Sequence, residues 1–104
     1  GLKEQFATCP IVEGALTRWF VRAEGHAGTS IAVQELQKVH ANPRHQFWPD
    51  DVSYTHVKWD GVLGHKQVTD AYLAALARKH KGRLATLDRG LAALHQDVAE
   101  LIPV

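Results

Sequence analysis

The chain has 104 residues, of which 45% are hydrophobic and 22% are charged, and its formal net charge is +1. This length allows one domain with a modest core and leaves no room for a second. The composition is that of an ordinary globular protein, which excludes a disordered or fibrous chain, and any surface that binds a polyanion must be local because the net charge is close to zero.

The first half of the chain predicts a strand followed by two helices. Residues 6–12 are apolar and interrupted by Pro10, which is typical of a strand end or an edge strand. Residues 13–23 repeat apolar side chains at three and four positions, so they predict a helix with one buried face. A second helix is expected between capping side chains at residues 29–30 (Thr29 and Ser30) and the breaking pair at 42–43.

The middle of the chain predicts a second strand and a third helix. Residues 45–52 are interpreted as a strand that ends in a turn, because proline and paired aspartates break regular pairing. Thr69 is a good N-cap for a helix over residues 70–80, in which one face is expected to hold Leu73, Leu76, Ala77 and His80. Gly82 is expected to end this helix.

The last part of the chain predicts two further strands. Residues 83–87 predict a short buried strand that Asp88 ends. Residues 90–95 predict one or two helical turns, and residues 99–104 predict a last strand. Strands and helices therefore alternate, which favours an α/β fold with a parallel sheet.

Three acidic residues fall at the predicted strand-helix junctions. Glu13 follows the first strand, Asp70 opens the third helix and Asp88 follows the next strand. Each alone is better explained structurally, as a first-turn acid or a cap. Carboxylates gathered at one sheet edge would repel one another unless they shared a cation, and oxygen ligands suit Mg²⁺ or Mn²⁺. The three together predict a divalent metal site.

Other kinds of site receive less support from the sequence. No histidine pair has the helical spacing of a zinc motif, so surface or structural roles are favoured for His40, His45, His56 and His65. Neither the two serines nor Cys9 lies in a recognisable nucleophile motif, and no glycine-rich phosphate loop is present.

A basic run follows the third predicted helix. It can be a solvated helix end, where cations favour the dipole, or a patch that binds a polyanion, and the sequence supports both equally. Its members are Arg78, Lys79, His80, Lys81 and Arg83, with Arg89 just beyond.

The single cysteine, Cys9, cannot form an internal disulfide and is expected to be a small buried residue in a reducing cytoplasm. No apolar run is long enough to cross a bilayer, and the N-terminus lacks the features of a signal peptide. We therefore expect a cytoplasmic protein that is not bound to a membrane.

Four stretches of the sequence together resemble one family. They read GHKQVTDAYLAALA at 64–77, GRLATLDRGL at 82–91, ATCPIVEGALTR at 7–18 and FWPDD at 47–51. This pattern closely resembles the C-terminal half of PIN-domain proteins, in particular the VapC-type toxins of bacterial toxin-antitoxin pairs. The resemblance implies a three-layer α/β/α fold with a central parallel sheet. It also implies a ribonuclease that depends on Mg²⁺ or Mn²⁺ and hydrolyses the RNA phosphodiester.

The resemblance also implies roles for individual residues. Glu13, Asp70 and Asp88 match the second, third and fourth acids of the family, which bind the metal and carry catalysis. Further residues are expected to support the site or contact the RNA substrate: Thr69, Arg18 and Arg89. Family members form homodimers and are inhibited by a VapB-type antitoxin, whose C-terminal tail enters the active-site groove.

One part of the family pattern is missing. The family opens with a central strand that ends in an aspartate, and nothing before Phe6 matches it. The chain starts at Gly1 and contains no methionine, so residues 1–104 are interpreted as the C-terminal portion of a single PIN-like domain, incomplete at its N-terminus. We expect the neighbours of the missing strand to lack backbone pairing, and we expect the fragment alone to have little nuclease activity.

Two other functions stay open at this point. A catalytically impaired PIN-like module could hold RNA or a protein partner, and the missing first acid favours that alternative. A phosphoacceptor domain of the response-regulator kind would need a lysine late in the chain, but Lys81 precedes the last predicted strand.

Overall fold

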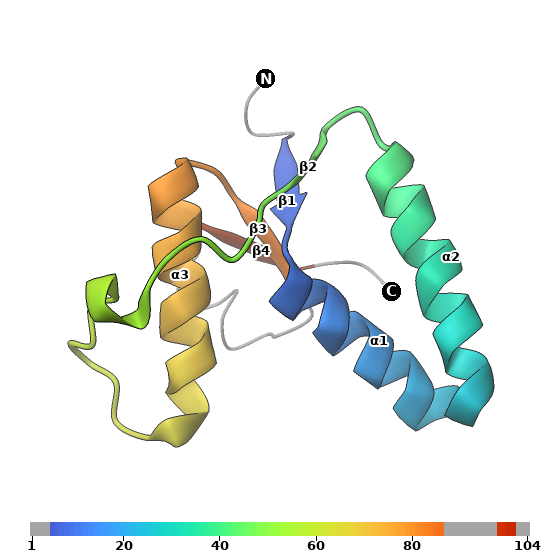
Figure 1. The fold of residues 1–104 in the computed structure, drawn as a ribbon, viewed down its shortest axis with the longest axis horizontal. Helices are drawn as coiled ribbons and strands as arrows, with labels where there is room; N and C mark the ends of the chain where they lie inside the picture. The colour runs from blue at the N-terminus through green and yellow to red at the C-terminus, as the bar shows by residue number, and fades with distance from the viewer. Residues whose placement is uncertain (1–4, 87–97, 102–104) are drawn as a thin grey trace.

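The computed structural model describes residues 5–86 and 98–101 (Figure 1). Strands and helices alternate along this part of the chain. They are β1 (Phe6–Thr8), α1 (Pro10–Glu24), α2 (Gly28–Ala41), β2 (His45–Phe47), α3 (Val68–His80), β3 (Leu84–Thr86) and β4 (Ala99–Leu101). Short 3₁₀ turns lie at Gly25–Ala27, Tyr54–His56 and His65–Gln67.

The strands form one sheet in the order β2-β1-β3-β4, and each neighbouring pair is parallel. Helices α2 and α3 lie on opposite sides of these strands (Figure 1). This arrangement confirms the predicted α/β fold with a parallel sheet. No described helix is long and apolar enough to cross a membrane.

The centre of the sheet is joined less extensively than its two flanks. Three residue pairs join β1 to β2 and three join β3 to β4, whereas β1 and β3 meet at the single pair Ala7 and Leu84. Here the Ala7 backbone N–H donates to the Arg83 carbonyl oxygen at 2.8 Å. At Ala7, β1 and β3 therefore approach closely enough to bond directly, and the lack of pairing expected beside a missing central strand stays a prediction.

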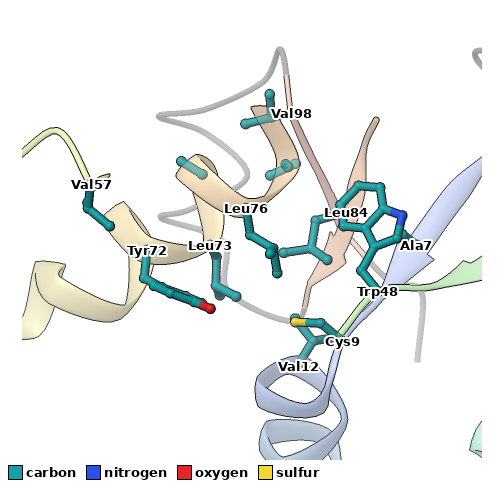
Figure 2. Packing of buried hydrophobic residues seen from close by; sticks show 13 residues of the cluster. Ala7, Cys9, Val12, Trp48, Val57, Tyr72, Leu73, Leu76, Leu84 and Val98 are labelled. Atoms are coloured by element: carbon teal, nitrogen blue, oxygen red, sulfur yellow. The ribbon is translucent and has the colours of Figure 1, made fainter. Parts of the chain in front are cut away.

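Helix α3 supplies more residues to the buried core cluster than any other described element (Figure 2). Its side chains Tyr72, Leu73, Leu76 and Ala77 are at most 5% exposed. They pack in one cluster with residues of the strands and of the segment after β2: Ala7, Leu84, Val98, Ala99 and Trp48. The predicted buried face of this helix is thus confirmed at Leu73, Leu76 and Ala77.

The end of α3 is fixed by a left-handed residue followed by glycine. Lys81 has φ 54°, and the Gly82 N–H donates to the Ala77 carbonyl oxygen at 3.1 Å, which satisfies a carbonyl at the helix end. A Cβ on Gly82 would lie 2.6 Å from the Trp48 ring. The predicted stop at this glycine is confirmed, and the close packing of Trp48 gives it a second reason.

Helices α1 and α2 form a hairpin with much less burial. The start of α2 lies close to the backbone of α1, and this approach requires glycine at position 28, because a Cβ there would collide with the backbone of Phe20 and Val21. Large apolar side chains remain exposed on the hairpin: Trp19, Val21 and Val33.

Several predicted boundaries are wrong for local reasons. The strand predicted over 6–12 ends at Thr8, because Pro10 begins α1, a position where its fixed φ and missing N–H favour a helix. The strand predicted over 45–52 ends at Phe47, and Pro49 follows two residues later. The third helix begins at Val68, so Thr69 lies inside it and Gln67 occupies the N-cap position.

The second helix also begins earlier than predicted. It starts at Gly28, and Thr29 donates its hydroxyl to the His26 carbonyl oxygen at 2.9 Å, so neither Thr29 nor Ser30 is the N-cap. The strands predicted over 83–87 and 99–104 are confirmed at Leu84–Thr86 and Ala99–Leu101. Asp88, Arg89 and the helical turns predicted at 90–95 lie outside the described residues.

Candidate functional site

Four polar side chains from different elements meet beside β1. Thr8 ends β1, Glu13 lies in the first turn of α1, His40 is near the end of α2 and His45 begins β2. The Thr8 hydroxyl donates to Glu13 Oε2 at 2.7 Å and lies 2.7 Å from His45 Nε2. His40 Nε2 lies 2.6 Å from the same Glu13 oxygen. We call these four residues the Glu13 cluster.

The two imidazole rings of the Glu13 cluster lie close together. Their centroids are 4.4 Å apart, at an interplanar angle of 36°. Burial, and secondarily the neighbouring His40, lower the pKa of His45, while the Glu13 carboxylate opposes this shift. A neutral imidazole keeps a ring nitrogen that can accept a proton or a metal ion.

The Glu13 cluster has the donors of a metal site. Glu13, His40 and His45 each offer one ligand atom, and these atoms all lie within 4.8 Å of one another. The sequence favoured surface or structural roles for these histidines, and the hydrogen bond of each one fits such a role. A tight turn brings them together, in which the His45 N–H donates to the Asn42 carbonyl oxygen at 3.0 Å. The pair flanking the Asn42-Pro43 breaker was the signal that could have found them.

A separate cleft of about 590 Å³ lies between α1 and α3. It brings together three of the predicted site residues: Arg18 from α1, and Thr69 and Asp70 from the first turn of α3. Two further cations line it that the sequence analysis did not single out, Arg22 and Lys66. Arg22 lies on α1, across the cleft from Asp70, whereas Lys66 lies in the 3₁₀ turn His65–Gln67 just before α3.

Glu13 and Asp70 are placed on different sides of α1. The Glu13 carboxylate bonds to Thr8 and His40 toward α2, whereas Asp70 lines the cleft toward α3. Asp88 and Arg89 lie outside the described residues. A shared metal site of Glu13, Asp70 and Asp88 thus stays a prediction.

The basic run divides into two parts. Lys79 and His80 contact the Asp51 carboxylate at 3.4 Å and 3.0 Å. The hydrogen bond from His80, opposed by desolvation and helped by the charges of His80 and Lys79, holds the pKa of Asp51 below its ordinary value of 3.8. The remaining cations border a hollow of about 560 Å³ at the amino ends of the strands, together with His80: Arg78, Lys81 and Arg83.

Cys9 is fully buried, and burial raises the pKa of its thiol to about 11. The thiol is therefore protonated at neutral pH and is a poor nucleophile. This confirms the small buried role predicted from the sequence.

These features define a class of protein. The protein is a parallel α/β domain with a carboxylate in the first turn of each of two helices and with cations that line the cleft beside one of them. This arrangement suits a phosphate-bearing ligand together with a divalent cation. Comparison with known proteins identifies the family within this class.

Three relatives from Mycobacterium tuberculosis strain H37Rv match most of the chain. Ribonuclease VapC29 is 55% identical over 98 residues, which are 94% of this chain and 72% of that protein. Ribonuclease VapC39 is 38% identical over 84% of this chain and 67% of its own length. Ribonuclease VapC38 is 35% identical over 88% of this chain and 67% of its own length.

No family model matches the chain, and no solved structure matches it. The identity and coverage of the VapC relatives are nevertheless sufficient, and the chain belongs to the VapC family of PIN-domain ribonucleases, the toxins of toxin-antitoxin systems. The resemblance stated from the sequence motifs, and the PIN-like fold that it implied, are thereby confirmed.

Proposed function

We propose that this protein is an endoribonuclease that hydrolyses RNA phosphodiesters with Mg²⁺ or Mn²⁺, and that it acts as the toxin of a VapBC-type pair. The observation that carries the proposal is the cleft between α1 and α3, where the Asp70 carboxylate faces a set of cations in a chain 55% identical to a VapC ribonuclease. Acidic and basic side chains facing each other suit a metal ion and the phosphate that it binds.

The donor chemistry of this cleft fits a hard cation. Mg²⁺ prefers oxygen ligands and is usually bound by one or two carboxylates together with waters. Asp70 supplies a carboxylate and Thr69 a hydroxyl from adjacent positions of α3, in a cleft large enough for waters. The residues proposed to hold the metal are Asp70, Asp88 and Glu13. When bound, the ion would offset charge on the phosphodiester and lower the pKa of an attacking water.

The residues of the cleft itself would bind and orient the RNA. Arg18, Arg22 and Lys66 line it and can bind phosphate oxygens, Arg in a bidentate manner. Such contacts position the backbone without reading its sequence. Thr69 can donate a hydrogen bond to a phosphate oxygen from the first turn of α3, and Arg89 is proposed to support the same site.

The cleft and the α1–α2 hairpin support the proposals about partners. A VapB-type antitoxin that places an acidic tail among Arg18, Arg22 and Lys66 would exclude RNA by competing for these cations. The exposed apolar side chains of the hairpin, Trp19, Val21 and Val33, suit burial between two copies in a homodimer. We propose a cytoplasmic location, where both the RNA and the antitoxin would be met.

The test is RNA cleavage by the natural full-length protein carrying Asp70→Asn. The neutral amide is a weaker metal ligand of nearly the same size, so we expect cleavage to fall by about 100-fold or more while folding is preserved. Glu24→Gln is the matched control, because Glu24 is exposed at the end of α1 away from the cleft. An unchanged rate in Asp70→Asn would contradict the proposal. RNA binding without cleavage in the unsubstituted protein would favour the impaired binding module instead.

A further inference from the structure

We propose that Glu13, His40 and His45 form a binding site for a divalent transition-metal ion of the zinc class, whose two nitrogen donors distinguish it from the oxygen-donor site proposed at Asp70. The inference does not depend on nuclease activity, although Glu13 belongs to both proposals. It rests on the geometry, burial and donor chemistry of the Glu13 cluster.

The ligand atoms are already close to the separations that a metal would impose. With metal-ligand distances of about 2.0–2.1 Å, a tetrahedral ion separates its ligand atoms by about 3.3 Å. His40 Nε2 and Glu13 Oε2 are 2.6 Å apart, and all three ligand atoms lie within 4.8 Å of one another. Shifts of up to about 1.5 Å, within the reach of side-chain rotation, would therefore accommodate an ion with these ligand separations.

A buried residue supports the ligands from behind. Thr8 is only 1% exposed, and its hydroxyl contacts both Glu13 Oε2 and His45 Nε2 at 2.7 Å. These hydrogen bonds fix the orientation of Glu13 and His45, and a metal ion would replace the proton of each ring nitrogen that it binds. The rings of Phe6 and Phe47 pack against His45 and His40, with centroids 5.5 Å and 5.8 Å apart, and restrict the imidazoles further.

The cluster is also open to solvent on one side. The side chains of His40 and Glu13 are 41% and 19% exposed, so an ion can enter and keep a water as an additional ligand. Three protein ligands with one open position are typical of zinc sites that hold a water, and two histidines with one carboxylate also suit other first-row transition metals.

The donor set distinguishes this site from the cleft. Two nitrogens and one oxygen favour Zn²⁺, Co²⁺ or Ni²⁺ over Mg²⁺, which prefers oxygen alone. The ion would also connect the start of α1, the end of α2 and the start of β2, three segments held together here through the contacts of the Glu13 cluster. Binding is thus expected to stabilise the folded protein.

The test is Zn²⁺ binding to the untagged full-length protein, measured by titration calorimetry in excess Mg²⁺. We expect one Zn²⁺ per chain, an increase of several degrees in the melting temperature, and the visible absorption of a low-coordinate ion when Co²⁺ replaces Zn²⁺. His40→Ala and His45→Ala should each weaken Zn²⁺ binding by about tenfold or more. His26→Ala, at an exposed histidine in the turn between α1 and α2, is the matched control and should bind as the unsubstituted protein does.

Two outcomes would overturn the proposal. Unchanged Zn²⁺ affinity in His40→Ala, which alters an exposed side chain and should fold, would overturn the proposal and leave the cluster as a hydrogen-bond network only. If His45→Ala fails to fold, His40→Ala and the Co²⁺ spectrum still decide. Asp70→Asn should retain Zn²⁺ binding, and its loss there would overturn the claim that Glu13, His40 and His45 hold the ion without Asp70. Cleavage measurements on Asp70→Asn test the nuclease proposal independently.

Discussion

The two sides of helix α1 are built differently. Toward α3 it meets an apolar core and, beside that core, an open cleft with Asp70, Arg18 and Thr69. Toward α2 it contributes Glu13 to a polar cluster, next to a hairpin with exposed apolar side chains. One helix therefore serves two purposes. The side of α1 toward α3 gains stability from buried apolar area, whereas the side toward α2 depends on directional polar contacts and on one close approach of the two backbones.

We expect the largest loss of stability from removing a buried side chain in the core on the α3 side. Leu76 is fully buried in α3, so Leu76→Ala should lower the free energy of unfolding by about 2–5 kcal/mol, through lost apolar burial and the cavity left behind. Chemical denaturation measures this change. Leu63→Ala removes the same atoms at a residue that is 91% exposed and should change stability little. Equal effects of the two substitutions would contradict the described core.

The α1–α2 hairpin is best tested at Gly28, where the start of α2 lies close to the backbone of α1. Gly28→Ala places a methyl group against the backbone of Phe20 and Val21, so α1 and α2 must separate, and we expect a loss of about 1–3 kcal/mol. Gly14→Ala is the matched control, because a Cβ there meets nothing within 4 Å in the same helix pair. It should stabilise the protein by about 0.5–1 kcal/mol through helix propensity. Thermal melts that rank both substitutions alike would refute the close approach at Gly28.

The smallest expected effect concerns a polar contact at the end of α3. Because His80 and Lys79 hold the pKa of Asp51 below its ordinary value of 3.8, the charged form is favoured in the folded state. This contribution to stability is present above the ordinary pKa and is lost as the pH falls through the lowered one. Asp51→Asn removes it, so the two proteins should differ modestly in melting temperature at about pH 6 and converge toward about pH 3. A difference that grows on acidification would have the wrong sign.

Much of the fold could be predicted from local patterns. The apolar spacing of the third helix identified Leu73, Leu76 and Ala77 as buried, and Gly82 marked its end. Boundaries were less accurate where one residue satisfies two patterns. Pro10 suits both a strand edge and a first helical turn, and only the continued helical backbone after it distinguishes them.

The candidate site was predicted only in part. Thr69, Asp70 and Arg18 do share a cleft, which lies between α1 and the first turn of α3. The neighbours of Glu13 were missed. His40 and His45 are 27 and 32 positions away in sequence, and no spacing rule for a single helix or strand connects them to it.

The sequence by itself determined the alternation of strands and helices, the buried face of α3 and the membership of the VapC family, because periodicity and motifs are properties of contiguous residues. Only the tertiary structure decided that Glu13 turns toward two histidines while Asp70 faces the other side of α1. The physical reason is that such contacts depend on strand order, on register and on the turn after α2. These bring together residues that local propensity treats as independent.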